Sequence, residues 1–439
     1  MVHVIFKNDF LNLGIQIQSM KKYLLFILLF SVLKYHSKAE CGERYLYKVF
    51  DSVDIIRDIP FGQSVHSTGD VYDLKMDIYM PHGDVETNRP LFVYMHGGTF
   101  VSGDKGEFEG YGPPEDMAKR GYVGVSINYR TEPSLLSLTS AELMIKAVMR
   151  VVHDCRASIR YFYKDVKENG NTYGIDTNWV FVGGASAGSI AALHLAYLDD
   201  TSELELKYRK FLRGFDGGDL EGISGNPGYS STVRGVCDVS GCLANTSYMF
   251  NNADIAVYSL HNIIDLTIPY DKGYPMFIPI LPIVEGSKPI QERARMIGAL
   301  HYFETIYDEG HVPYKDGESP VQPIFDNMMR ETYKLFYQRM GCNPNAVISG
   351  VNINKNSGWK IFPNLLSPGN PVRLENQKYN PVNTAILSLT DITGREIISQ
   401  KVTTSYLSVP TDKLPTGIYF VQIRNSDGEL QLSDKIVLQ

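Results

Sequence analysis

The pattern of hydrophobic and polar positions differs between two parts of the chain. Residues 48–59 and 71–79 are extended runs, and the second alternates between apolar and polar positions as a half-buried strand does. From Pro90 onward, short continuous apolar runs alternate with longer stretches of helical spacing. This pattern predicts strand–helix–strand crossover units and a mostly parallel sheet with helices on both faces.

The same pattern locates the main elements of this first part. A helix is predicted over residues 141–163, because apolar side chains recur there on one helical face. The predicted fold class is therefore α/β, with antiparallel strands at the start of a mixed sheet. Buried strands are predicted at residues 91–95, 122–128, 179–182, 233–239, 255–260 and 301–306.

A polar segment rich in asparagine, glycine and proline separates this part from a second one. Clusters of these residues are typical of linkers and turns, and we place the linker at residues 343–360. Residues 361–439 hold only short alternating strands punctuated by turns. The pattern predicts an α/β domain over residues 40–342 and a small all-β sandwich over residues 361–439.

The N-terminal region reads as a secretory signal peptide over residues 20–39. Two lysines precede the apolar run 23–33, and small residues follow at the expected cleavage positions. The run is much shorter than the roughly 20 residues that a spanning helix needs, so we expect no stable membrane span. Residues 1–19 fit no signal peptide, and we interpret Met20 as the true start.

Composition and charge exclude several other classes of protein. Hydrophobic residues make up 44% and charged residues 21% of the 439 residues, as in an ordinary soluble protein. The 42 basic against 49 acidic side chains give a net charge of −7, which argues against a nucleic-acid partner.

Cys237 and Cys242, two of five cysteines, flank a short turn and either pair or remain buried thiols. The cysteines and histidines lack zinc spacing, and we expect neither a metal nor an organic cofactor.

Candidate chemistry begins at Ser186. Gly184-Ala185-Ser186-Ala187-Gly188 follows a predicted strand and precedes a predicted helix, which is the context of a nucleophile elbow. The turn is sharp, so the positions two before and two after the serine must be small. The pattern predicts a serine hydroxyl exposed at the carboxyl end of a central strand.

A second glycine-rich turn ends the predicted strand 91–95. His96-Gly97-Gly98 resembles the glycine loops whose backbone amides approach a developing oxyanion. Together with Ser186, this turn predicts an acyl-transfer site at one edge of the sheet.

A serine nucleophile needs a base and an acid that orients the base. His311 directly follows the last predicted strand, which makes it the predicted base. Asp265 follows the preceding strand and is the predicted acid, while Asp238 at the end of residues 233–239 is the alternative. The predicted chain order is serine, aspartate, histidine.

These motifs resemble the α/β-hydrolase superfamily and, within it, secreted bacterial carboxylesterases. The resemblance implies an acyl-serine mechanism with Ser186 as nucleophile, His311 as base and Asp265 as its orienter. It also implies oxyanion donors from the backbone, with a neighbouring glycine giving room: the donors are Gly98, Thr99 and Ala187, and the glycine is Gly97. The matching segments are residues 96–100, 126–130, 176–180, 184–188, 265–269 and 310–313.

The C-terminal part resembles the sorting domain of type IX secretion, an export route of Bacteroidetes. The resemblance rests on residues 361–364, 389–395, 414–421 and 435–438. It implies passage through the periplasm to the cell surface or the exterior, with the type IX machinery as partner.

The function predicted from the sequence is a secreted serine esterase acting on small or polymer-linked carboxylic esters. A serine peptidase of the same fold and a non-catalytic adhesion protein are the alternatives. Residues 201–233 form a long glycine-rich and charged insertion, which either borders the acyl pocket or is an idle surface loop. No residue selects among plant-wall esters, short-chain lipids and polyesters.

Overall fold

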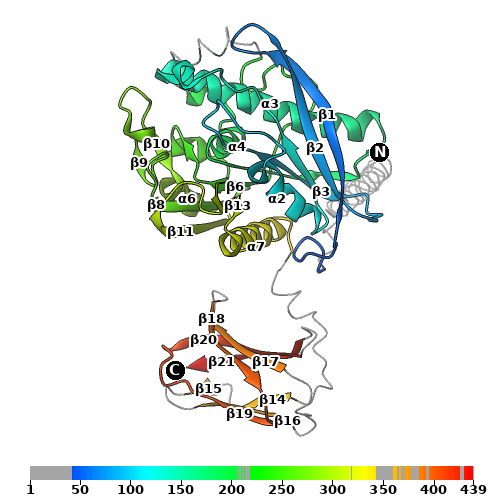
Figure 1. The fold of residues 1–439 in the computed structure, drawn as a ribbon, viewed down its shortest axis with the longest axis vertical. Helices are drawn as coiled ribbons and strands as arrows, with labels where there is room; N and C mark the ends of the chain where they lie inside the picture. Colours follow the sequence, from blue (N-terminus) through cyan, green and yellow to red (C-terminus); the bar gives the residue numbers. More distant parts are fainter. Residues whose placement is uncertain are drawn as a thin grey trace, which may run out of the picture. The chain divides into compact units, whose positions relative to one another are not determined.

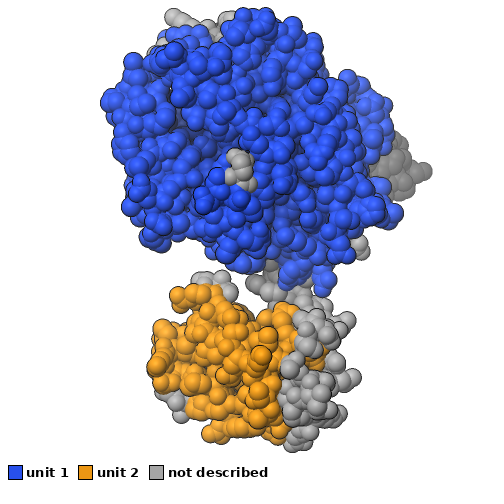
Figure 2. Space-filling view, in the orientation of Figure 1, with its two compact units in different colours: residues 1–343 blue, residues 344–439 orange. Residues whose placement is uncertain are grey.

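The computed structural model divides the chain into two compact units, residues 1–343 and 344–439 (Figures 1 and 2). The predicted signal peptide and most of the predicted linker, residues 343–358, lie outside the described residues. Within the described part, no helix combines the length and hydrophobicity needed to cross a membrane. The structure describes residues 42–204, 206, 209, 212, 218–317, 319–342, 359–362, 365–366, 371–376, 385–391, 395–425 and 430–438.

The first unit is built on an eight-stranded sheet with the order β1-β2-β4-β3-β5-β6-β8-β11. Neighbouring strands from β4 to β11 are parallel, whereas β2 pairs antiparallel with both β1 and β4. The predicted α/β fold class is confirmed. The strands are β1 (Val53–Val65), β2 (Val71–Pro81), β3 (Arg89–Met95), β4 (Val123–Ile127), β5 (Ile175–Ala185), β6 (Gly235–Val239), β8 (Ala256–Ile264) and β11 (His301–Glu309).

Helices on both faces explain why the central strands read as continuous apolar runs. Every residue of β3, β4 and β6 is buried. Figure 1 shows α3 and α4 on one side of the strands and α7 on the other. The helices of this unit are α2 (Phe108–Ala118), α3 (Ala141–Glu168), α4 (Ala187–Tyr197), α6 (Ser287–Ile297) and α7 (Gln322–Arg339), with short 3₁₀ turns η1 (Leu135–Leu138), η2 (Thr201–Glu203), η3 (Thr246–Met249) and η4 (Pro275–Phe277).

Several element ends differ from the sequence prediction. β1 begins at Val53 instead of residue 48 and continues past Pro60 with two register shifts. Proline is tolerated there because β1 is an edge strand, which has a partner strand on one side only, so its missing N–H need not remove a hydrogen bond between strands. α3 begins at the cap Ser140, whose side chain accepts a hydrogen bond from the Leu143 N–H, and it extends to Glu168.

A small three-stranded sheet, absent from the sequence prediction, lies beside α4 and α6. It has the order β7-β10-β9, and β7 packs against α4. Cys242 on β7 and Cys237 on β6 are both buried free thiols, so they do not pair with each other. Cys342 is disulfide-bonded. The short strands of this unit are β7 (Cys242–Leu243), β9 (Lys272–Gly273), β10 (Val284–Gly286), β12 (Lys315–Asp316) and β13 (Ser319–Pro320).

The second unit has strands joined by turns and no helix among its described residues. They form two sheets, with the orders β14-β16-β19 and β15-β21-β20-β17-β18. Leu374 of the first sheet and Leu387 and Val421 of the second belong to one buried apolar cluster, so the sheets enclose a common core. The strands are β14 (Trp359–Phe362), β15 (Leu365–Leu366), β16 (Val372–Asn376), β17 (Ala385–Asp391), β18 (Glu396–Val402), β19 (Tyr406–Val409), β20 (Gly417–Asn425) and β21 (Leu430–Leu438).

Candidate active site

Ser186 occupies the sharp turn between β5 and α4. Its backbone has φ 50° and ψ −118°, a conformation that residues other than glycine rarely adopt. The Ser186 N–H donates to the carbonyl of Val239 on the neighbouring strand, at 2.9 Å. This bond and the packing of α4 hold the turn, so the side chain stands at the carboxyl edge of the sheet.

The two glycines of the turn are required by close packing of backbone on backbone. A Cβ at Gly184 would lie 2.3 Å from the carbonyl carbon of Gly188, and a Cβ at Gly188 would lie 2.2 Å from the Met95 carbonyl oxygen. No flexible side chain is involved that could move aside. The glycines therefore let α4 start directly against the end of β3.

Three side chains from separate strand ends form a continuous chain of hydrogen bonds. Ser186 Oγ lies 2.7 Å from His311 Nε2, and His311 Nδ1 lies 2.6 Å from Asp265 Oδ2. They follow β5, β11 and β8, whose carboxyl ends lie at the same edge of the parallel sheet. The backbone N–H of Gly310 donates to the Ile264 carbonyl, which ties the two loops together.

Asp265 is buried and surrounded by hydrogen-bond donors. Its Oδ1 accepts the backbone N–H groups of Thr267 and Ile268 at 2.8 and 3.0 Å. Its Oδ2, besides accepting from His311, lies 3.2 Å from Nε2 of the buried His261. Burial alone would raise the pKa of Asp265, but the bonds to His261 and His311 outweigh it and hold the pKa far below its ordinary value. The carboxylate therefore stays ionised and fixes Nδ1 of His311 as a proton donor.

The alternative acid, Asp238, faces other groups. Its carboxylate accepts from the hydroxyls of Ser189 and Ser287 and from the Gly241 N–H, at 2.5 to 3.0 Å. Of the two aspartates proposed from the sequence, the structure brings Asp265 to His311. Sequence reasoning missed the contact of His261 with Asp265, which only the turn at 265–268 creates.

The glycine loop after β3 borders the same cavity as Ser186 through Thr99. The N–H of Gly97 donates to the buried Glu109 side chain of α2. Within the described residues, no acceptor is recorded for the N–H groups of Gly98, Thr99 and Ala187. Gly98 and Thr99 have left-handed φ values of 106° and 55°, and the Ala187 N–H opens α4. Thr99 and Ala187 line the same cavity as Ser186, so their N–H groups are candidates to bind an oxyanion.

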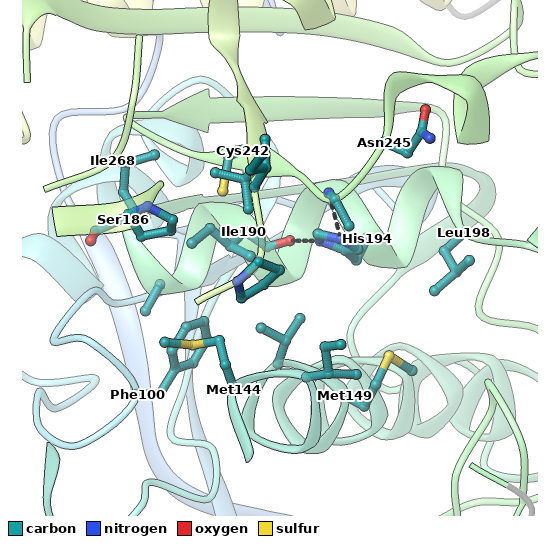
Figure 3. Close-up of a pocket in the computed structure, with 18 of the residues that line it drawn as sticks. Phe100, Met144, Met149, Ser186, Ile190, His194, Leu198, Cys242, Asn245 and Ile268 are labelled. Carbon is teal, nitrogen blue, oxygen red and sulfur yellow. Dashed lines mark hydrogen bonds between the residues drawn. The ribbon is translucent and has the colours of Figure 1, made fainter. Parts of the chain in front are cut away.

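A cavity of about 220 Å³ opens beside Ser186 and runs along α4 (Figure 3). Figure 3 places Ser186 at one end and Leu198 at the other, with Met144 and Met149 of α3 across from the helix. Most lining side chains are aliphatic, and thus the cavity suits an apolar group. His194 lines it too, but its Nδ1 donates to the Ile190 carbonyl and its Nε2 accepts the Ala244 N–H.

Among the described residues of the insertion at 201–233, those that line this cavity lie at its start. Glu203 and Leu204 line the cavity, whereas residues 218–221 and 229–233 line a separate polar cavity around Arg156. The facing wall is formed instead by residues 267–284, a segment that the sequence reading did not single out. Its apolar run with prolines at 275, 279 and 282 was the available signal.

Comparisons with known families agree with this architecture. Residues 76–241 match the BD-FAE family, and residues 360–439 match the secretion system C-terminal sorting domain. The first unit carries an α/β-hydrolase-type esterase domain. The sorting domain that follows it indicates type IX secretion to the cell surface or the exterior.

Individual relatives of the esterase domain are distant. Lipase 1 of Geotrichum candidum is 29% identical over 134 residues, covering 29% of this chain and 23% of the lipase. A probable N-octanoylanthranilate hydrolase of Rhodococcus erythropolis is 28% identical over 131 residues, which cover 30% of this chain and 27% of the hydrolase. The chain thus spans about a quarter of the length of the curated relatives it matches.

The solved structures that this chain matches include two esterases. Esterase 2 of Thermogutta terrifontis, phosphorylated by paraoxon, has 16% identity and a TM-score of 0.45, covering 66% of this chain and 95% of its own. A truncated carbohydrate esterase from gut microbiota has 15% identity and a TM-score of 0.43, and the match covers 66% of this chain and 97% of that one.

In the part of the chain that the structure describes, no group of three acidic, histidine or cysteine side chains could hold a metal ion.

Proposed function

We propose that the esterase domain hydrolyses carboxylic esters through an acyl-serine intermediate. The observation that carries the proposal is the hydrogen-bond chain from Ser186 Oγ through the His311 imidazole to the Asp265 carboxylate. A serine hydroxyl is a weak nucleophile unless an adjacent base takes its proton. This arrangement supplies the base and an ionised group that orients it.

In the first half of the reaction, Ser186 Oγ attacks the ester carbonyl carbon while His311 Nε2 takes the hydroxyl proton. The negative charge that develops on the carbonyl oxygen is stabilised by the N–H groups of Gly98, Thr99 and Ala187. His311, now protonated and paired with Asp265, gives its proton to the leaving alkoxide. An alcohol departs and the acyl group stays on Ser186.

In the second half, water takes the place of the alcohol. His311 removes a proton from the water as its oxygen attacks the acyl carbonyl, and the same N–H groups hold the oxyanion. The proton then returns to Ser186 Oγ as the bond to the acyl group breaks. A carboxylic acid leaves and the free serine is restored, without a cofactor.

Hydrolysis of p-nitrophenyl acetate, butyrate and octanoate by residues 40–439 tests this function. Ser186→Ala should lower kcat by at least about 10³-fold, because the nucleophile and its partners act as a unit. Ser67→Ala, at an exposed serine on the turn between β1 and β2, is the matched control and should leave kcat unchanged.

Two results would contradict the proposal. Ester turnover that survives Ser186→Ala would remove the serine from the mechanism. Folded protein that cleaves peptide p-nitroanilides but no ester would favour a peptidase, and inactivity on both would favour an adhesion protein.

A further inference from the structure

We propose that the cavity along α4 binds the acyl chain of the ester and selects aliphatic chains of about eight to ten carbons. This inference rests on the proposed esterase function and names its substrate class. It is argued from the position of the cavity relative to the reacting groups, its size and the chemistry of its walls.

The position of the cavity decides which half of the ester enters it. During acylation, His311 must reach the oxygen of the leaving alcohol, so the alcohol lies beside the imidazole. Of the described residues, Ser186 and the donors Thr99 and Ala187 line the cavity, and His311 does not. With the carbonyl oxygen on those donors, the substituent that points into the cavity is the acyl chain.

Size sets the length of that chain. A cavity of about 150 Å³ holds a benzene ring, so by proportion the 220 Å³ present here corresponds to about nine carbons. Helix geometry gives a similar result. His194 lies two turns beyond Ser186, about 12 Å along α4. An extended chain of nine carbons, with bonds of about 1.5 Å set at tetrahedral angles, spans about 10 Å and so ends close to that depth.

The walls favour an aliphatic chain. Ile190, Val148 and the two methionines of α3 contribute apolar surface, and methionine adapts easily to a flexible ligand. Two polar side chains at the far end are partly engaged with the backbone. Glu203 Oε2 accepts the N–H groups of residues 199 and 200, and Asn245 Oδ1 accepts that of Ser247. The aliphatic surface therefore predominates along the length of the cavity.

The segment that forms the facing wall also carries exposed apolar side chains. Ile283 lines the cavity and is 45% exposed, and Phe277 and Ile280 of the same segment are 70% and 63% exposed. Exposed apolar side chains in this segment favour contact with an apolar ligand.

The test is the dependence of kcat/KM on acyl length for residues 40–439. The substrates are p-nitrophenyl acetate, butyrate, octanoate and hexadecanoate, each below its aggregation limit. Burial of each added methylene should raise kcat/KM about two- to fourfold up to octanoate. Hexadecanoate should bring no further gain, because the cavity is full.

Two variants narrow the cavity at the depth of His194. Ala244→Phe starts from an exposed alanine whose N–H binds His194 Nε2, so folding is little affected. Met149→Trp fills the same region from α3. Each should lower kcat/KM for octanoate by about tenfold or more and leave acetate within about twofold. Val85→Phe, at a residue that is 92% exposed, is the control and should change neither.

The inference is overturned if acetate is the best substrate, if methyl ferulate is preferred to octanoate, or if neither folded variant changes the octanoate-to-acetate ratio. Acetate turnover that depends on Ser186 in any of these cases would leave the esterase proposal intact. Loss of the esterase proposal would instead appear as inactivity on every ester.

Discussion

At the scale of single residues, the two buried aspartates near the site differ in which groups share their oxygens. Asp265 receives His311, whereas Asp238 receives two serine hydroxyls and a backbone N–H. Asp265→Asn keeps the shape but no longer fixes the imidazole with Nδ1 as donor. We expect kcat to fall by about 10⁴-fold with little change in KM, measured on p-nitrophenyl butyrate.

Asp238→Asn is the matched control for that variant. It removes a charge that three donors share, so we expect a lower free energy of unfolding and a much smaller loss of kcat. A larger loss of kcat for Asp238→Asn than for Asp265→Asn would make Asp238 the acid.

His194 gives stability a pH dependence of predictable sign. Burial lowers its pKa from 6.5 to about 4, so the folded state keeps the ring neutral. Above pH 6.5 the His194 ring is neutral in both the folded and the unfolded chain, so its titration does not change the free energy of unfolding. Between pH 6.5 and 4 the unfolded chain binds a proton that the folded chain does not, which lowers the free energy of unfolding by up to about 3 kcal/mol.

Urea unfolding at pH 7, 5.5 and 4.5 measures this effect. His194→Gln, which has no titrating ring, should lose correspondingly less stability over this range than the wild-type protein. Asp265 does not obscure the comparison, because its pKa lies far below the range and its contribution is lost only in stronger acid. Equal pH dependence in both proteins would contradict the assignment.

At the scale of elements, the junction of β5 and α4 depends on backbone contact with β3. A Cβ at Gly188 would meet the Met95 carbonyl at 2.2 Å, so Gly188→Ala must push α4 away from the sheet. We expect a loss of about 1–3 kcal/mol in the free energy of unfolding and a fall in kcat, because Ser186 and the Ala187 N–H move with the helix.

Gly42→Ala controls for the general effect of replacing a glycine. A Cβ there meets no atom within 4 Å, and its φ is not left-handed. Both the melting temperature and kcat should stay at wild-type values. If Gly188→Ala behaved in the same way, the close contact could not be what positions the serine.

At the scale of the whole molecule, the two units have separate cores and separate tasks. The esterase domain holds every candidate site residue, and residues 360–439 match the sorting domain. We predict that deleting residues 344–439 leaves kcat on p-nitrophenyl butyrate unchanged and abolishes export. Cell fractionation of a strain with the type IX machinery checks the second effect, and a truncated chain that still reached the medium would contradict it.

Much of the architecture could be predicted because burial leaves a local trace. β3, β4 and β6 are buried on both faces and read as continuous apolar runs, and the alternating strands of the second unit read as half-buried. α2 left no such trace, since it contains Pro113 and Pro114. Its conformation depends on tertiary packing: Gly124 of β4 has no Cβ, which would lie 2.1 Å from the Pro114 carbonyl.

The sequence by itself determined the fold class and the strand-turn-helix around Ser186, because both follow from local spacing and from glycine at positions that tolerate no side chain. Only the tertiary structure decided which aspartate meets His311, since Asp238 near the end of β6 and Asp265 just after β8 both belong to strands that end at the same edge. It also decided that residues 267–284 face the cavity, whereas among the described residues of 201–233 Glu203 and Leu204 do. The sequence order of two loops carries no information on which one folds over α4; that depends on the pairing of β7, β9 and β10 and on the apolar surface they bury.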